Sequence, residues 1–218
     1  MTEELTTLPA PDSWDGVESK TVDVAVRKAL AKFILPTKDS NDRRPIVPNF
    51  FLEIKSPGGD AVVAGRQVLN NGAYGARAIH YLQQYGSREP VYDNKAHVFS
   101  ATYQNGLLSL FAHHVTPPCR YSPNGHPEIW MTEIDTYALR AHKTGFANGV
   151  AAFRNLRDKA LQERIEIVQG ANARHLELDA AWKEFLLRFT RDLSDDEDME
   201  DSDDSALEDD SDEGYNDD

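Results

Sequence analysis

The apolar residues in the first third of the chain recur at two different spacings. Across residues 21–35 they follow the spacing of an amphipathic helix, and Pro36 ends that segment. Residues 37–48 are polar and contain two prolines, which predicts a loop. The run at residues 50–55 is largely apolar and is followed by Gly58-Gly59, so it predicts a strand that ends at a turn.

The middle of the chain predicts a second helix and a β-hairpin. Asp60 is a suitable N-cap for a helix over residues 61–85, which is rich in Ala and Gly and could therefore pack closely on a sheet. The β-prone runs at residues 96–103 and 107–113 are joined by Gln104-Asn105-Gly106. Asn-Gly between two such runs is a strong hairpin signal.

A further strand and a long helix complete the pattern. Residues 128–136 alternate between apolar and polar and predict the strand. We expect Asn148 to cap a helix that runs from Gly149 to about Leu187, with a break near Gly170. Helices that alternate with strands in this order predict an α/β fold.

The composition fits one main domain with tails. The chain has 218 residues, 40% of them apolar, and its single cysteine excludes an intrachain disulfide and fits a reducing compartment. The first residues lack the basic and apolar regions of a secretory signal, and no apolar run approaches the roughly 18 residues of a membrane span. The sequence therefore predicts a nuclear or cytoplasmic protein that is not secreted and has no membrane partner.

The net charge of −14 is concentrated at the C-terminal end. Residues 192–218 hold 16 of the 37 acidic residues and no Lys or Arg, which leaves 21 acids against 23 bases for residues 1–191. We expect a flexible arm at residues 1–11, a domain at 12–190 and a disordered acidic tail at 191–218. Such a tail would bind a basic protein partner or mask a nucleic-acid-binding face of the domain.

The strongest candidate for chemistry is the pair formed by Glu53 and Lys55. Two residues apart on a strand, their side chains point to the same face, and charged groups in a buried strand are costly unless they have a partner or a function. One interpretation is an ion pair at a sheet edge. The other is a metal-dependent nuclease site, in which the carboxylate holds a divalent metal and the lysine positions the attacking water. A second carboxylate would be needed, and the upstream candidates are Asp12, Asp15 and Asp23.

The chain resembles the PD-(D/E)XK endonuclease-like superfamily, and more narrowly a fungal family of proteins with that expected fold. The resemblance covers most of residues 9–175. It is carried by six short motifs: Pro11-Asp12, Phe50-Phe51-Leu52-Glu53-Ile54-Lys55, Gly65-Arg66-Gln67, Tyr92-Asp93-Asn94-Lys95-Ala96, His113-His114 and Phe153-Arg154-Asn155-Leu156-Arg157-Asp158.

This resemblance implies a restriction-endonuclease-like mixed sheet flanked by helices. It also implies that Asp12 and Glu53 hold Mg²⁺ or Mn²⁺, and that Lys55 orients water and offsets the charge that builds on the phosphate. Gln67 matches a polar residue that some members aim at the site, although it also suits an exposed helix position.

Two features depart from the superfamily pattern. Only eleven residues precede Asp12, too few for the helix and strand that come before the first acid, so we expect an N-terminally truncated chain or a shortened paralogue. Residues 11–16 also read more like a turn than a buried strand. Two functions therefore stay open: a Mg²⁺-dependent nuclease acting on DNA or RNA, and a catalytically inactive interaction protein of the same fold.

Two weaker signals concern histidines and arginines. The spacing of His113, His114, Cys119 and His126 fits no standard zinc pattern, and adjacent histidines on a strand face opposite ways. A phosphate-binding face could be lined by Lys55 and Lys95 together with Arg66, Arg77, Arg154 and Arg157. The alternative is that these arginines are solvated, which suits the near-neutral charge of residues 1–191.

Overall fold

A computed structural model of the protein describes residues 10–34, 45–121 and 125–200, with side chains through residue 188. The chain divides into two compact units, Met1–Leu176 and Glu177–Asp218. The sheet and the helices that cover it belong to the first unit. In the second unit, the helix α3 continues through residue 200.

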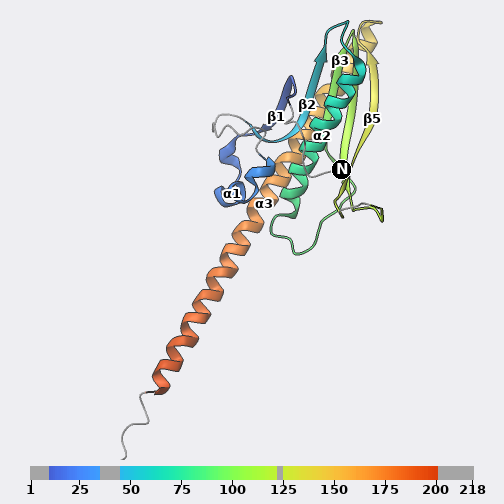
Figure 1. Ribbon diagram of the computed structural model, residues 1–218. Helices are drawn as coiled ribbons and strands as arrows, with labels where there is room; N and C mark the ends of the chain where they lie inside the picture. Colours follow the sequence, from blue (N-terminus) through green and yellow to red (C-terminus); the bar gives the residue numbers. More distant parts are fainter. Residues whose placement is uncertain (1–9, 35–44, 122–124, 201–218) are drawn as a thin grey trace, which may run out of the picture. The chain divides into compact units, whose positions relative to one another are not determined.

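The first unit is built on a five-stranded mixed sheet whose strands lie side by side in chain order. Only β2 and β3 are parallel, because helix α2 connects them, and the other neighbouring pairs are antiparallel (Figure 1). The strands are β1 (Ser13–Val17), β2 (Ile46–Lys55), β3 (Ala96–Gln104), β4 (Leu107–Thr116) and β5 (Glu128–Ala138).

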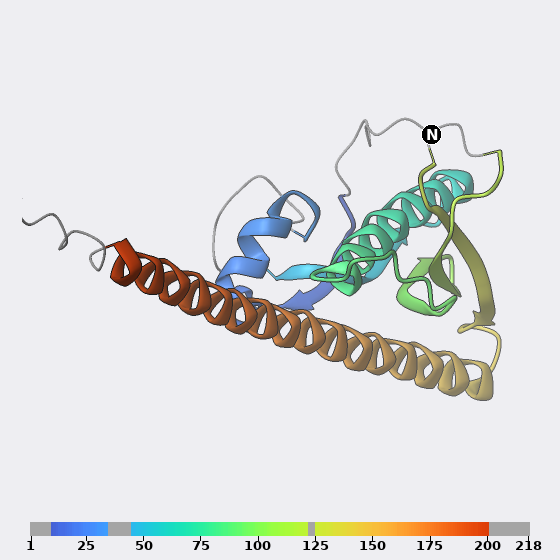
Figure 2. The same cartoon turned by 90° about the horizontal axis from the view of Figure 1, so that it is seen from below.

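Helices cover both faces of the sheet. The helices are α1 (Val24–Ile34), α2 (Ala61–Gln84) and α3 (Lys143–Glu200), with a 3-10 turn at Ser19–Thr21. Figure 2 shows the sheet between α2 and the first turns of α3. Successive side chains of β2 point to opposite faces of the sheet, so β2 packs against both helices. Phe50 meets Phe153 of α3 edge-on, and Phe51 packs beneath Gly75 of α2. The expected α/β fold with a mixed sheet flanked by helices is thus confirmed.

Several local predictions are confirmed by the structure. Asp60 caps α2, because its Oδ1 accepts a hydrogen bond from the Val62 N–H at 2.8 Å. The turn between β3 and β4 has positive φ at Asn105 (47°) and Gly106 (84°), as a two-residue type I′ hairpin requires. Tyr81 stacks on Phe33 of α1, with ring centroids 3.7 Å apart, and so packs α2 against α1.

Three predictions, which concern β1, the start of β2 and the start of α1, are wrong. Residues 13–17 form β1 rather than a turn, and β2 begins at Ile46, inside the predicted loop. Pro48 is tolerated in β2 because it falls opposite the irregularity between Asp15 and Val17, where the ladder is interrupted. Helix α1 begins at Val24 because the Asp23 carboxylate accepts a hydrogen bond from the Ala25 N–H at 2.7 Å.

The long helix also differs from its prediction. It begins at Lys143 because His142, and not Asn148, caps it: His142 Nδ1 accepts from the Gly145 N–H at 2.8 Å. It continues without a break through Gly170 to Glu200, the last described residue, so residues 191–200 of the predicted disordered tail are helical. The rest of that tail, and residues 1–9 of the predicted arm, lie outside the described residues.

His113 is a buried part of the core rather than a metal ligand. Its ring is 1% exposed and lies directly beneath Gly72 of α2, and its Nε2 contacts the Ser100 hydroxyl at 2.7 Å. The adjacent His114 is more exposed, as expected for the opposite face of β4. Within the described part of the chain, no group of three His, Cys, Asp or Glu side chains is arranged to hold a metal ion.

We expect His113 to make the fold sensitive to mild acid. Burial, with a smaller effect from His114, lowers the pKa of His113 from 6.5 to about 4. A histidine with a lowered folded-state pKa stabilises the fold above its unfolded pKa, and this stabilisation is lost as pH falls from 6.5 towards 4. The shift corresponds to about 3 kcal/mol. Urea unfolding of wild type and His113→Asn at pH 7 and about pH 4.5 checks this, because the variant should lose distinctly less stability than wild type; equal losses would contradict it.

Candidate functional site

Glu53 is a buried carboxylate that is held by two neighbouring side chains. It lies on β2 and is 1% exposed. Asn71 Nδ2 of α2 donates to Glu53 Oε1 at 2.6 Å, and Lys55 Nζ contacts Glu53 Oε2 at 3.3 Å. The Lys55 side chain is 19% exposed, so its ammonium group lies where the buried carboxylate meets solvent. The expected shared face of Glu53 and Lys55 is confirmed.

The turn after β2 packs against Lys55. A Cβ added at Gly59 would lie 3.1 Å from the Cβ of Lys55, so only a small residue leaves room for the lysine stem. The turn is tied to the next strand, because Gln104 Nε2 donates to the Gly59 carbonyl at 2.5 Å. Gln104 is also the register partner of Lys55, so the ends of both parallel strands support the same corner of the site.

Asp12 lies next to Glu53 across the first two strands. Ser13 pairs with Leu52 in the antiparallel ladder, which brings the residue preceding β1 beside the residue that follows Leu52 on β2. Asp12 is exposed, and its Oδ2 accepts a hydrogen bond from the Ile54 N–H at 2.7 Å. The carboxylate thereby extends the ladder past the end of β1, beside the strand that carries Glu53.

The other two candidate acids serve structural roles. Asp15 forms a bidentate ion pair with Arg157 of α3, at 2.5 and 2.8 Å, which raises the pKa of Arg157. Asp23 is the N-cap of α1. Of the three upstream acids, Asp12 is the one whose backbone lies across from Glu53 in the β1–β2 register.

Gln67 lies one helical turn before Asn71 and so on the same side of α2. Its Oε1 is buried and has no hydrogen-bond partner among the described residues. A buried amide oxygen without a donor is costly, unless a water molecule or a cation occupies the space beside it. Gln67 is therefore an inward-facing residue rather than an ordinary exposed glutamine.

Sequence reasoning missed Asn71, although its position carried a signal. The buried stripe of α2 repeats at intervals of four and three residues: Ala64, Val68, Asn71, Gly75, Ala78 and Leu82. Asn71 is the polar member of that stripe and is 2% exposed. A polar side chain at a core position needs a buried partner, and the partner is Glu53.

The predicted phosphate-binding face does not assemble as expected. Lys55 ends β2 and Lys95 directly precedes β3, and because these strands are parallel the two lysines lie at opposite ends of the sheet. Arg157 is neutralised by Asp15. Arg66 and Arg154 are exposed, as the alternative of solvated arginines expects.

A second charged cluster lies at the other end of the sheet. His97 bridges two carboxylates: its Nδ1 contacts Glu163 at 2.5 Å and its Nε2 contacts Asp93 at 2.7 Å. Burial raises the pKa of Glu163, but hydrogen bonds from Lys159 and His97 outweigh burial and lower it overall. The cluster ties α3 to the segment before β3, and its groups are paired with one another rather than directed at a shared ligand.

Comparison with known proteins assigns the chain to a family. Residues 3–171 match the family described as a domain of unknown function, DUF7924, and the chain belongs to that family. The match includes all five strands, α2 and the residues around Glu53. No curated protein and no solved structure matches the chain. Among the described residues, no helix has the length and hydropathy needed to cross a bilayer.

Proposed function

We propose that the protein is a Mg²⁺-dependent nuclease-like protein that hydrolyses phosphodiester bonds in DNA or RNA. The observation that carries this proposal is the Glu53–Lys55 pair, a nearly inaccessible carboxylate beside a lysine that still reaches solvent. Burial of a charge is costly, and function is one reason to retain it. Asp12 lies at the neighbouring end of the β1–β2 ladder, and Gln67 lies one helical turn from Asn71, the hydrogen-bond partner of Glu53.

The donor set is compatible with a divalent metal. Mg²⁺ is commonly held by one or two carboxylates, with water and substrate phosphate oxygens completing its octahedron, and Asp12 and Glu53 would supply the two carboxylates. The buried Gln67 Oε1, which lacks a donor among the described residues, is the kind of atom that a bound cation or its water would satisfy. When bound, the metal would polarise the phosphoryl group and acidify a water molecule.

The residues of the chain would have distinct tasks. Lys55 would orient the attacking water and offset negative charge on the phosphate, because its ammonium group lies at the solvent boundary. Asn71 is a positioning residue: it holds one oxygen of Glu53 and so fixes the plane of that carboxylate.

The strand arrangement supports a restriction-endonuclease-like fold as part of the proposal. The first acid directly precedes β1, Glu53 and Lys55 lie on its antiparallel neighbour β2, and α2 then leads to the parallel strand β3. Asp12, directly before β1, and Glu53 on β2 are then cross-strand neighbours, as the proposed site requires.

Lys55→Ala should abolish cleavage while leaving the protein folded. The side chain is partly exposed, so its truncation removes the positioned cation without opening a cavity in the core. The measurement is cleavage of labelled single- and double-stranded DNA and RNA in about 5–10 mM Mg²⁺ or Mn²⁺, conditions that suit the weak affinity typical of such sites. Lys20→Ala is the matched control, since Lys20 is an exposed lysine paired with Glu18.

Wild type and Lys20→Ala should cleave equally, and Lys55→Ala should lose at least about a hundredfold in rate. Cleavage retained by folded Lys55→Ala would remove the proposed role of the pair. Absence of cleavage by wild type on all of these substrates would instead favour the second candidate function.

The second candidate is a catalytically inactive interaction protein with the same fold. Both oxygens of Glu53 already contact protein groups, and Asp12 completes the β1–β2 ladder. Such contacts are expected if Glu53 and Asp12 stabilise the fold and do not bind a metal. A metal titration distinguishes the two functions, because a purely structural cluster would bind no divalent ion.

A further inference from the structure

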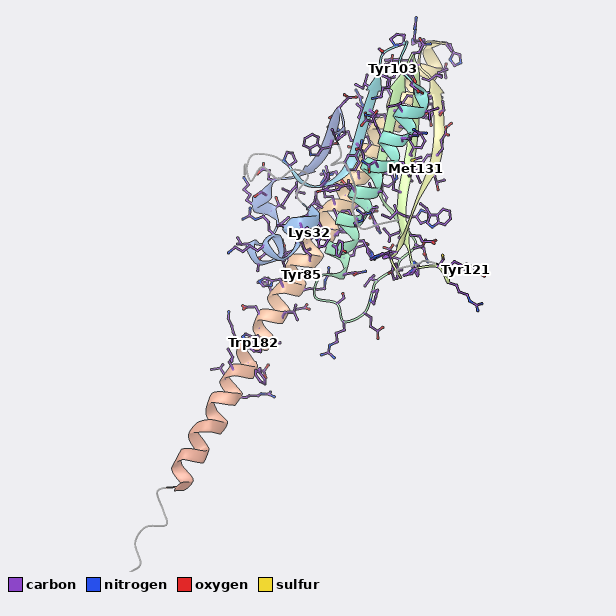
Figure 3. All side chains as sticks on the ribbon, viewed as in Figure 1. Lys32, Tyr85, Tyr103, Tyr121, Met131 and Trp182 are labelled. Atoms are coloured by element: carbon purple, nitrogen blue, oxygen red, sulfur yellow. The ribbon has the colours of Figure 1, made fainter. Side chains whose placement is uncertain are left out.

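The part of α3 that belongs to the second unit carries an exposed apolar stripe. Leu178, Trp182, Phe185 and Leu186 are 48%, 59%, 54% and 41% exposed, and their spacing brings them to one side of the helix, roughly 100° wide. The rings of Trp182 and Phe185 stack with centroids 5.5 Å apart. Figure 3 labels Trp182 on this part of α3.

Ion pairs border the stripe on both sides. Lys183 contacts Asp179 at 2.7 Å, and Arg188 contacts Glu184 at 2.6 Å, each across one helical turn. By helical spacing, the first pair lies along one edge of the stripe and the second pair along the other. The apolar side chains therefore form a defined surface with polar borders, rather than a scatter of exposed residues.

This surface has the geometry of a helix-docking seam. Leu178, Trp182 and Phe185 are separated by four and then three residues, which is the spacing of the a and d positions of a coiled coil. Contiguous exposed apolar side chains with a polar rim commonly mark a protein interaction site. An aromatic pair at the centre of such a seam is a typical binding anchor.

The charge that follows the stripe indicates which partner fits. Residues 192–218 contain 16 acidic residues and no Lys or Arg. A second copy of this chain packed in parallel on the seam would bring two such segments together, and their repulsion opposes that pairing. A basic partner would instead be attracted by the same segment.

We propose that the stripe formed by Leu178, Trp182, Phe185 and Leu186 docks a basic amphipathic helix of another protein. The apolar face of the partner helix covers Trp182 and its neighbours, and its basic face meets the acidic residues that follow. The seam supplies the contact area, and the acidic segment supplies long-range attraction and selects against neutral or acidic helices.

The test uses the full-length protein and a synthetic helical peptide of Leu and Lys, about 18 residues long, as the probe. Binding is measured by fluorescence anisotropy at about 0.1 and 0.5 M NaCl. The stripe variant is Leu178→Glu/Trp182→Glu, and the matched control is Leu187→Glu, which changes an exposed leucine on the opposite side of the helix. A third variant replaces the acidic residues of 195–213 by Asn and Gln.

Wild type and Leu187→Glu should bind the peptide equally, and the stripe variant should bind at least about tenfold more weakly at both salt concentrations. The neutralised variant should bind about tenfold more weakly at the lower salt concentration and show little salt dependence. Equal binding by the stripe variant would overturn the proposal, as would no binding by wild type. Sedimentation that shows a wild-type dimer abolished by the stripe substitutions would also overturn it, in favour of a second copy.

Discussion

Gly72→Ala should destabilise the protein by about 2–3 kcal/mol, although alanine normally strengthens a helix. A Cβ at position 72 would lie 2.0 Å from His113 Cε1 and within 2.3 Å of both ring nitrogens. The ring cannot move away easily, because it is 1% exposed and is held by Ser100. Helix α2 would therefore have to lift from the sheet. Chemical denaturation at pH 7 measures the effect.

Gly65→Ala is the matched control in the same helix. An added Cβ there meets no atom within 4 Å, so the substitution should stabilise the protein by about 0.5–1 kcal/mol. The double variant Gly72→Ala/His113→Ala should be more stable than the sum of the two single changes predicts, because removal of the ring removes the clash. Additive effects, or a neutral Gly72→Ala, would show that His113 does not pack beneath this helix.

Glu53→Ala should be the most destabilising substitution at the candidate site, at about 3 kcal/mol. It leaves the Asn71 amide, which is 2% exposed, without its acceptor, and it leaves Lys55 without its counter-ion. Glu53→Gln should cost about 1–2 kcal/mol, because its amide oxygen can still accept from Asn71 while its amide nitrogen cannot accept from Lys55.

Combining Glu53→Gln with Asn71→Leu separates the two contacts of Glu53, the hydrogen bond from Asn71 and the contact to Lys55. Asn71→Leu removes the donor to Glu53 but leaves the contact to Lys55, so in that background Glu53→Gln should still cost about 1–2 kcal/mol, because the Lys55 contact that it removes is present in both backgrounds. Urea unfolding of wild type, the two single variants and the double variant measures this. Equal stabilities of wild type, Glu53→Ala and Glu53→Gln would contradict the buried network that the structure describes.

Local sequence signals predicted much of the fold. The Asn105-Gly106 turn and the Asp60 cap act through their immediate neighbours, so the sequence alone identifies them. The pairing of Glu53 with Lys55 follows from strand alternation within β2. Each of these features depends on contacts a few residues apart.

The features that sequence reasoning missed depend on distant contacts. Residues 13–17 contain turn-forming residues but become β1 because β2 offers a strand edge and Arg157 of α3 neutralises Asp15. Asn71 gains its role only when α2 packs over Glu53, 18 residues earlier in the chain. His142 caps α3 through its side chain, and histidine is not a residue that a cap prediction favours.

Calorimetric titration of Mn²⁺ and Mg²⁺ into wild type and Glu53→Gln tests whether Asp12 and Glu53 form the proposed site for a divalent ion. We expect a saturable binding isotherm in wild type that disappears in folded Glu53→Gln. Asp158→Asn is the control and should bind like wild type, because this exposed α3 residue is not part of the proposed site. No binding in wild type, or equal binding in Glu53→Gln, would contradict the proposed metal site.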